Sequence, residues 1–190
     1  HCDFVYEKGA FVSAMQLDDA EDARLISLVS ASKTFNLAGL QQAAMLTRNQ
    51  TIRHAVIEQM RNTGVKFGNL FALVGTEAAY RHGDPWLDGL TAYLDAARTL
   101  LRSELAARLP EAICSPQEAT YLAWLDLRAY GLTTAELMRR TYDAGVALSP
   151  GLFFDPKLGE GFLRLNFACP HSQTLEAVRR LETALRGRSY

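Results

Sequence analysis

The chain has 190 residues, a formal net charge of −1, 48% hydrophobic residues and 22% charged residues, which allows one large domain or two small ones. This near-neutral balance argues against a nucleic-acid or membrane-surface binder, because both need a basic face, and no apolar run approaches the roughly 18 residues of a membrane span. The three widely spaced cysteines, Cys2, Cys114 and Cys169, favour a reducing, cytoplasmic compartment.

The opening "HCDFVYEKGAF" has the pattern of a strand end that runs into a loop. Since no initiator methionine precedes it and domains rarely begin so abruptly, we expect a piece of a longer protein. Residues 25–29, "LISLV", predict a short buried strand. A loop then leads to a second predicted strand around 41–47.

Two amphipathic helices follow in the sequence. Apolar residues recur at helical spacing over 49–63, with Asn49 as the predicted N-cap and Gly64 as the stop. The second helix is predicted over 69–81 and ends near Gly83.

The longest helical pattern covers residues 85–109, where leucines recur at helical spacing. Pro85 suits the first helical position and Asp84 a preceding N-cap. A helix of this length usually connects two packing units. We therefore predict a domain boundary inside it, which gives domains 1–92 and 93–190.

The remainder predicts a small α+β unit. Alternating and capped patterns predict, in order, a strand (120–127), a helix (133–146), an extended segment (146–151), a half-buried strand (161–169) and a helix (172–187). Ser172 is the predicted N-cap of the last helix and Gly187 its stop. Tyr121 and Trp124 are expected to pack in the core of this unit, because aromatic residues on a strand usually pack.

Lys33 follows the first apolar run and has small hydroxyl residues beside it. Because it follows an apolar strand, we expect it to be partly desolvated, which would lower its pKa and make its amine a nucleophile near neutral pH. Ser30, Ser32 and the turn's N–H groups could hold a phosphate, as a pyridoxal 5′-phosphate (PLP) site requires. A solvated lysine and a β-lactamase-type Ser-x-x-Lys are the alternatives. The latter lacks its Ser-Asp-Asn and Lys-Thr-Gly partners here.

A longer string favours PLP. The similarity is carried, in chain order, by "SASKTFNLAGLQ" (30–41), "NLFALVGTEAAYRHGDPWLDGLTAYL" (69–94), "PQEATYLAWLDL" (116–127) and "GEGFLRLNFACP" (159–170). Together they resemble the fold-type I PLP enzymes, most closely the aminotransferase-like cystathionine β-lyase, or C–S lyase, branch. The resemblance implies an α/β fold: the C-terminal part of the three-layer PLP-binding large domain (1–92), then a small C-terminal α+β domain (93–190).

The resemblance also implies roles for individual residues. Lys33 would form the Schiff base with PLP and act catalytically, and Ser30 and Ser32 would contact the cofactor phosphate. Arg164 would bind the substrate α-carboxylate, although an internal salt bridge is the plain alternative for an arginine in a half-buried strand. Asn69 matches, more weakly, a region near the partner subunit's active site, and could simply cap a helix. No histidine has metal-ligand spacing, so no metal is expected.

The implied function is a cytoplasmic, homodimeric PLP-dependent C–S β-lyase. It would act on cystathionine- or cysteine-type amino acids and release a thiol, pyruvate and ammonia. A class I/II-type aminotransferase and a non-catalytic fragment or effector-binding domain are the alternatives. Two departures stand out: Gln41 occupies a position where many aminotransferases carry an arginine, and the aspartate that pairs with the pyridine nitrogen would precede His1.

Overall fold

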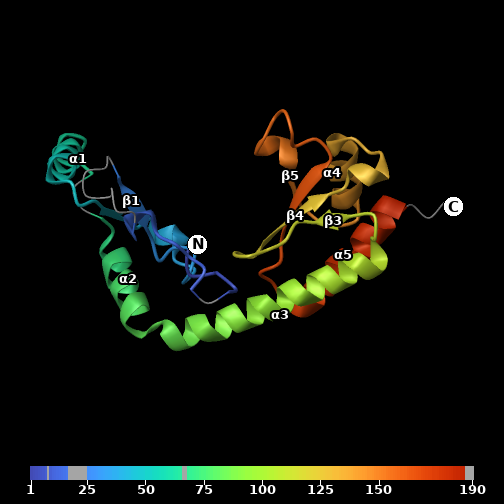
Figure 1. Ribbon diagram of the computed structural model, residues 1–190, viewed down its shortest axis with the longest axis horizontal. Coiled ribbons are helices and arrows are strands. Elements are labelled where there is room, and N and C mark those ends of the chain that lie inside the picture. Colours follow the sequence, from blue (N-terminus) through green and yellow to red (C-terminus); the bar gives the residue numbers. More distant parts are fainter. Residues whose placement is uncertain (8, 17–24, 66–67, 187–190) are drawn as a thin grey trace. The chain divides into compact units, whose positions relative to one another are not determined.

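The computed structural model describes the chain in four stretches: residues 1–7, 9–16, 25–65 and 68–186 (Figure 1). The chain divides into two compact units, His1–Leu90 and Thr91–Tyr190. The division lies inside the longest helix, α3 (Asp84–Arg108), so Asp84 is itself helical.

The first unit contains short strands and two helices. In chain order these are η1 (Ala14–Gln16), β1 (Ser27–Val29), η3 (Ala38–Leu40), β2 (Ala44–Leu46), α1 (Gln50–Asn62) and α2 (Leu70–His82). β1 and β2 form an antiparallel pair, which confirms both predicted strands. The predicted burial of the first is wrong, because Leu28 is 73% exposed. Among the described residues β1 pairs with β2 alone, and one neighbouring strand cannot enclose it.

Both helices of this unit have an asparagine N-cap, and that of α1 is the predicted Asn49. The Oδ1 atom of Asn49 accepts a hydrogen bond from the Ile52 N–H (3.1 Å), and α1 is followed by Gly64 in the left-handed region (φ 75°). Such a side-chain oxygen satisfies one of the free N–H groups of the first turn. The core here is small. Its buried members are Phe4, Ala31, Thr34, Thr47 and Ala72.

The second unit is an antiparallel sheet with helices. Its elements after α3 are β3 (Ile113–Cys114), β4 (Leu122–Asp126), η4 (Arg128–Tyr130), α4 (Thr134–Asp143), β5 (Ser149–Pro150), η5 (Gly151–Phe153), β6 (Phe162–Asn166) and α5 (His171–Arg186). The strand order is β3-β4-β6-β5. The predicted order of helices and strands along the chain is confirmed, except for β3. This strand has only two residues, too few for a recognisable sequence pattern, and was not predicted. α5 begins one residue before Ser172, which is therefore not its N-cap; the predicted stop, Gly187, lies outside the described residues.

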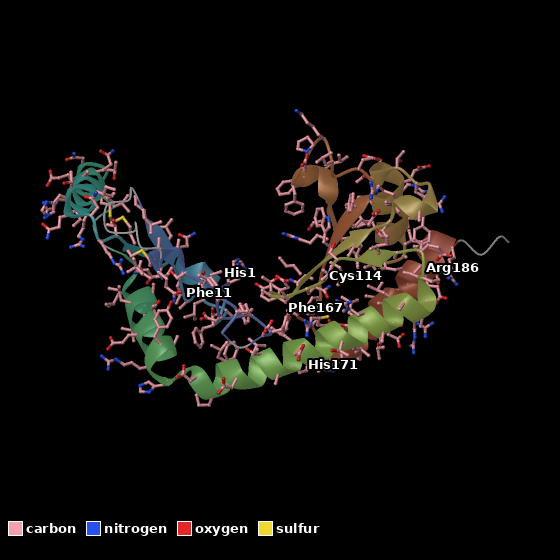
Figure 2. All side chains as sticks on the ribbon, in the orientation of Figure 1. His1, Phe11, Cys114, Phe167, His171 and Arg186 are labelled. Atoms are coloured by element: carbon pink, nitrogen blue, oxygen red, sulfur yellow. The ribbon has the colours of Figure 1, made fainter. Side chains whose placement is uncertain are left out.

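One face of this sheet and the helices form the main core. On β6 and just after it, Leu163, Leu165 and Phe167 are buried at 0–4% exposure, as their alternation predicts. They pack with buried leucines of α3 and with α4 and α5, and Tyr121 packs against the same cluster as predicted. Figure 2 marks Phe167 at the end of β6 and His171 at the start of α5. The fold thereby fixes β6, which carries Arg164.

Replacing Phe167 by alanine is expected to lower the free energy of unfolding by about 3–5 kcal/mol, because its ring is completely buried and its removal leaves a cavity. Urea unfolding followed by circular dichroism measures the change. Phe153, which is 80% exposed, is the matched control and should change stability by no more than about 0.5 kcal/mol on replacement by alanine. Equal losses in the two variants would contradict this packing.

Candidate active site

Ser30, Ser32 and Lys33 lie together on a tight turn that follows β1. The Ser30 hydroxyl donates to the Gln42 carbonyl (2.5 Å) and accepts from the Ser32 N–H (3.1 Å). The Phe35 N–H then donates to the Ala31 carbonyl at 2.9 Å. These bonds tie the turn to the segment that leads into β2, so the lysine is held on an ordered backbone rather than a free loop.

The turn is also anchored by its buried residues. Ala31 and Thr34 are each 2% exposed, and the Thr34 hydroxyl donates to Oδ2 of Asp3 (2.5 Å). Ala31 and Thr34 are three residues apart and share the buried side of the turn, whereas Ser32 is half-buried and Lys33 is exposed. The Asp3–Thr34 bond joins positions 31 residues apart, and no local pattern in the sequence could have predicted it.

The ring of Phe35 provides a further contact for the turn. It stacks on Trp86 (centroids 5.6 Å apart) and meets Tyr80 edge-on (6.2 Å). Gly83 leaves the room for this ring, because a Cβ there would come within 2.2 Å of Phe35 Cε1. The turn is therefore fixed against the junction of α2 and α3.

The side chain of Lys33 is exposed, which corrects the expectation that it is partly desolvated. Among the described residues β1 has β2 as its one neighbouring strand, and this open pair leaves the turn after β1 accessible to solvent. Neither this amine nor the Ser32 hydroxyl has a partner within the described part of the chain. The Ser30 proton, in contrast, is already donated to Gln42. Among the described residues, an incoming anion thus meets the Ser32 hydroxyl, which has no partner, and the Ser30 hydroxyl, which already donates to Gln42.

Asn69 occupies the N-cap of α2. Its Oδ1 accepts from the Phe71 N–H at 2.9 Å, which is the simple capping role that the sequence left open. A contact of Asn69 with a partner subunit stays a prediction.

Arg164 lies in the second unit, in the middle of β6 and half-buried. Its Nη2 lies 3.3 Å from the Ser149 hydroxyl, and its guanidinium carbon lies 4.5 Å from the centre of the Phe154 ring. No carboxylate pairs with it among the residues that the structure describes, so the internal salt bridge that the sequence allowed is not formed. A guanidinium in this state can donate two parallel hydrogen bonds to a carboxylate.

The expectation that Trp124 packs in the core is wrong. It lies opposite Arg164 in the β4–β6 register, on the face of the sheet that does not carry the buried side chains Ala123 and Leu125. Its ring stacks on Phe162 (5.8 Å) and meets Phe154 edge-on (5.6 Å). The open face therefore carries an aromatic row, which we define as Phe162, Trp124 and Phe154.

Sequence reasoning missed the two residues that hold Arg164. Ser149 is opposite Arg164 in the short β5–β6 pair, and Phe154 follows η5. The only available signal was the pair of phenylalanines next to a predicted extended segment, which does not specify what the rings contact. The described residues contain no cluster of acidic, histidine and cysteine side chains suited to a metal ion. No helix within the described ranges is both long and apolar enough to cross a membrane.

The geometry can be compared with known proteins. The family model for aminotransferase class I and II matches residues 1–181. The chain is 38% identical to cystathionine beta-lyase PatB of Bacillus subtilis over 169 residues, which is 88% of this chain and 43% of that protein. It thus spans less than half the length of this relative.

Solved structures agree with the sequence comparison. A PLP-bound, provisionally named aminotransferase of Clostridium difficile 630 matches with a TM-score of 0.92 and 30% identity, over 97% of this chain and 48% of that one. Cystalysin of Treponema denticola, which contains PLP, matches with a TM-score of 0.91 and 26% identity, over 98% of this chain and 47% of that one. Since the family model covers nearly all of the sequence, the chain belongs to the aminotransferase class I and II family.

Proposed function

We propose that the protein is a PLP-dependent C–S β-lyase that acts on cystathionine- or cysteine-type amino acids and releases a thiol, pyruvate and ammonia. Its relatives support this class, since PatB is named a cystathionine beta-lyase and PLP is present in the cystalysin structure. The observation that carries the proposal is the anchored turn that presents the exposed amine of Lys33, which has no partner among the described residues.

The turn fits a phosphorylated aldehyde. Lys33 offers a primary amine for covalent attachment, and the adjacent Ser32 offers a hydroxyl with no partner in the described residues. Ser30 fits this role only if its proton moves from the Gln42 carbonyl to a phosphate oxygen. Ser32 is therefore the readier of the two phosphate donors.

PLP, when bound, supplies an electron sink next to the substrate Cα. In this proposal Lys33 would hold the cofactor, and its amine would serve as the general base for the proton on the substrate Cα. Arg164 orients the substrate by its α-carboxylate, and Ser30 and Ser32 hold the phosphate. The residues that would distinguish β-elimination from amino transfer are not among these four.

The two units take separate roles in this proposal. His1–Leu90 would be the C-terminal part of the PLP-binding large domain, and Thr91–Tyr190 the small C-terminal domain. A homodimer is supported by the apolar side chains that α2 leaves exposed, among them Leu70, Phe71 and Val74 at 61–76%. A reducing cytoplasm agrees with the free thiols at Cys2, Cys114 and Cys169.

Reduction with borohydride tests the attachment directly. The protein is incubated with PLP, reduced and digested, and the peptides are measured by mass spectrometry. Hydride adds to the carbon of the C=N bond between PLP and Nζ, and a proton adds to the nitrogen, which gives a stable secondary amine. We expect the pyridoxyl mass on Lys33. An unmodified Lys33 peptide, or a label spread over the lysines, would contradict the proposal and favour a non-catalytic domain.

An aminotransferase is the second candidate, because the Clostridium difficile structure carries that name. Incubation with L-cystathionine separates the two reactions. A lyase forms pyruvate and ammonia without an added keto acid, whereas an aminotransferase needs a keto-acid acceptor for turnover.

A further inference from the structure

We propose that Phe154 is a positioning residue for Arg164. Its ring holds the guanidinium in place for the substrate carboxylate and, being neutral, does not neutralise the guanidinium's charge. The inference rests on the proposed function. The guanidinium carbon lies 4.5 Å from the Phe154 ring centre, within the range of a cation–π contact. The Ser149 hydroxyl, 3.3 Å from Nη2, fixes the edge of the same group.

The backbone that carries the Phe154 ring is fixed by local contacts, although 44% of the residue is exposed. It follows η5, and its N–H donates to the Gly151 carbonyl at 2.9 Å. Gly151 and Gly159 close the loop by direct backbone approach, because a Cβ on Gly151 would lie 2.4 Å from the Gly159 carbonyl oxygen. Inside the loop, Asp155 accepts hydrogen bonds from the Leu158 and Lys157 N–H groups, which lower the pKa of its carboxyl. The platform under Arg164 is thus preformed.

A second arginine on the same face shows the alternative arrangement. The guanidinium of Arg128 lies 4.7 Å from the centre of the Phe162 ring, at the other end of the aromatic row. It also donates to both carboxylate oxygens of Asp126, at 2.9 and 2.7 Å, and these bonds lower the pKa of Asp126. Arg128 is therefore already neutralised by the protein.

Arg164 has the aromatic contact and, among the described residues, no carboxylate partner. A neutral ring orients a guanidinium and leaves its N–H groups available to donate to a ligand carboxylate. An aspartate in the same place would compete with the ligand for these N–H groups. Preorganisation of this kind strengthens binding because less side-chain freedom is lost when the ligand arrives. The geometry points to Phe154 as a determinant of how tightly an amino acid is held by its carboxylate.

The test compares Phe154→Leu with Phe154→Tyr and with the control Phe153→Leu in the PLP-loaded protein. Phe153 is adjacent and exposed, and its ring meets the Phe154 ring edge-on (5.2 Å), but among the described residues the guanidinium of Arg164 lies over Phe154 and not over Phe153. Affinity is measured from the visible absorbance of the bound cofactor as L-alanine is titrated. Ethylamine, which is L-alanine without its carboxylate, is the second ligand.

Phe154→Leu should weaken L-alanine binding by about three- to tenfold, the size of one partly exposed cation–π contact, and leave ethylamine binding unchanged. Phe154→Tyr, which keeps a ring, should restore the affinity, and Phe153→Leu should leave it unaltered. In an Arg164→Lys background the effect of Phe154→Leu should shrink, because the planar group that the ring supports is gone.

Borohydride labelling of Lys33 in every variant separates the possible failures. If the unmutated protein is not labelled, the proposed function fails and this inference fails with it. If labelling is intact and Phe154→Leu binds L-alanine as the unmutated protein does, the inference alone is wrong. If Phe154→Leu weakens both ligands equally, its role is structural, which also overturns the inference.

Discussion

Lys33→Ala is expected to abolish covalent attachment of PLP and to reduce turnover of L-cystathionine by about 10²- to 10⁴-fold or more, because it removes both the attachment point and the proposed general base. The fold should survive, since the side chain is exposed and the turn is held by Ala31, Thr34 and Phe35 instead. The measurements are borohydride labelling, pyruvate release and the urea unfolding midpoint.

Lys157→Ala is the matched control for this variant. Lys157 is also an exposed lysine on a loop, and its backbone N–H rather than its amine is bound to Asp155 (2.8 Å). Its replacement should change neither labelling nor turnover. A Lys33→Ala protein that still carries PLP and still releases pyruvate would remove Lys33 from the proposed role.

Arg164→Ala should reduce kcat/KM for the amino-acid substrate by about 10²-fold, which corresponds to the loss of a charge-assisted hydrogen-bond pair of about 3 kcal/mol. Since no described carboxylate pairs with Arg164, its removal leaves no orphaned acid behind. The loss should therefore appear in substrate binding more than in stability. Initial rates over a range of L-cystathionine concentrations, together with urea unfolding, separate these two effects.

Arg128→Ala provides a stringent comparison, because Arg128 also lies over an aromatic ring on the same face of the sheet. Its guanidinium is bound to Asp126, so its removal should leave KM nearly unchanged. Arg164→Lys keeps the charge but loses the bidentate fork, and we expect an intermediate KM. If Arg128→Ala and Arg164→Ala raise KM equally, Arg164 has no specific part in carboxylate binding.

The local structure of the chain follows from short stretches of sequence. Asn49 caps α1 as predicted, and Asn69 caps α2, one of the two roles that the sequence left open for it; a cap satisfies N–H groups only two or three residues away. The alternation of Leu163, Leu165 and Phe167 likewise predicts the buried face of β6, since the period of a strand is fixed by its backbone. The turn that carries Lys33 and the half-buried strand that carries Arg164 were also recognised from patterns that extend over a few neighbouring residues.

The environment of the candidate residues depends on contacts that are distant in sequence. The exposure of Lys33, the engagement of Ser30 with Gln42 and the place of Trp124 on the open face each differ from the simplest expectation. Burial of a strand depends on what covers it, and β1 has a single neighbour in the described residues.

The sequence by itself therefore determined which segments become helices and strands and which side chains are candidates for chemistry. Only the tertiary structure decided that Arg164 rests on Phe154 and Ser149 while Arg128 is bound to Asp126. The physical reason is range. Caps and strand periods act over a few residues of one backbone, whereas the state of a charged group is set by whichever atoms the fold brings within hydrogen-bonding or ring-contact distance.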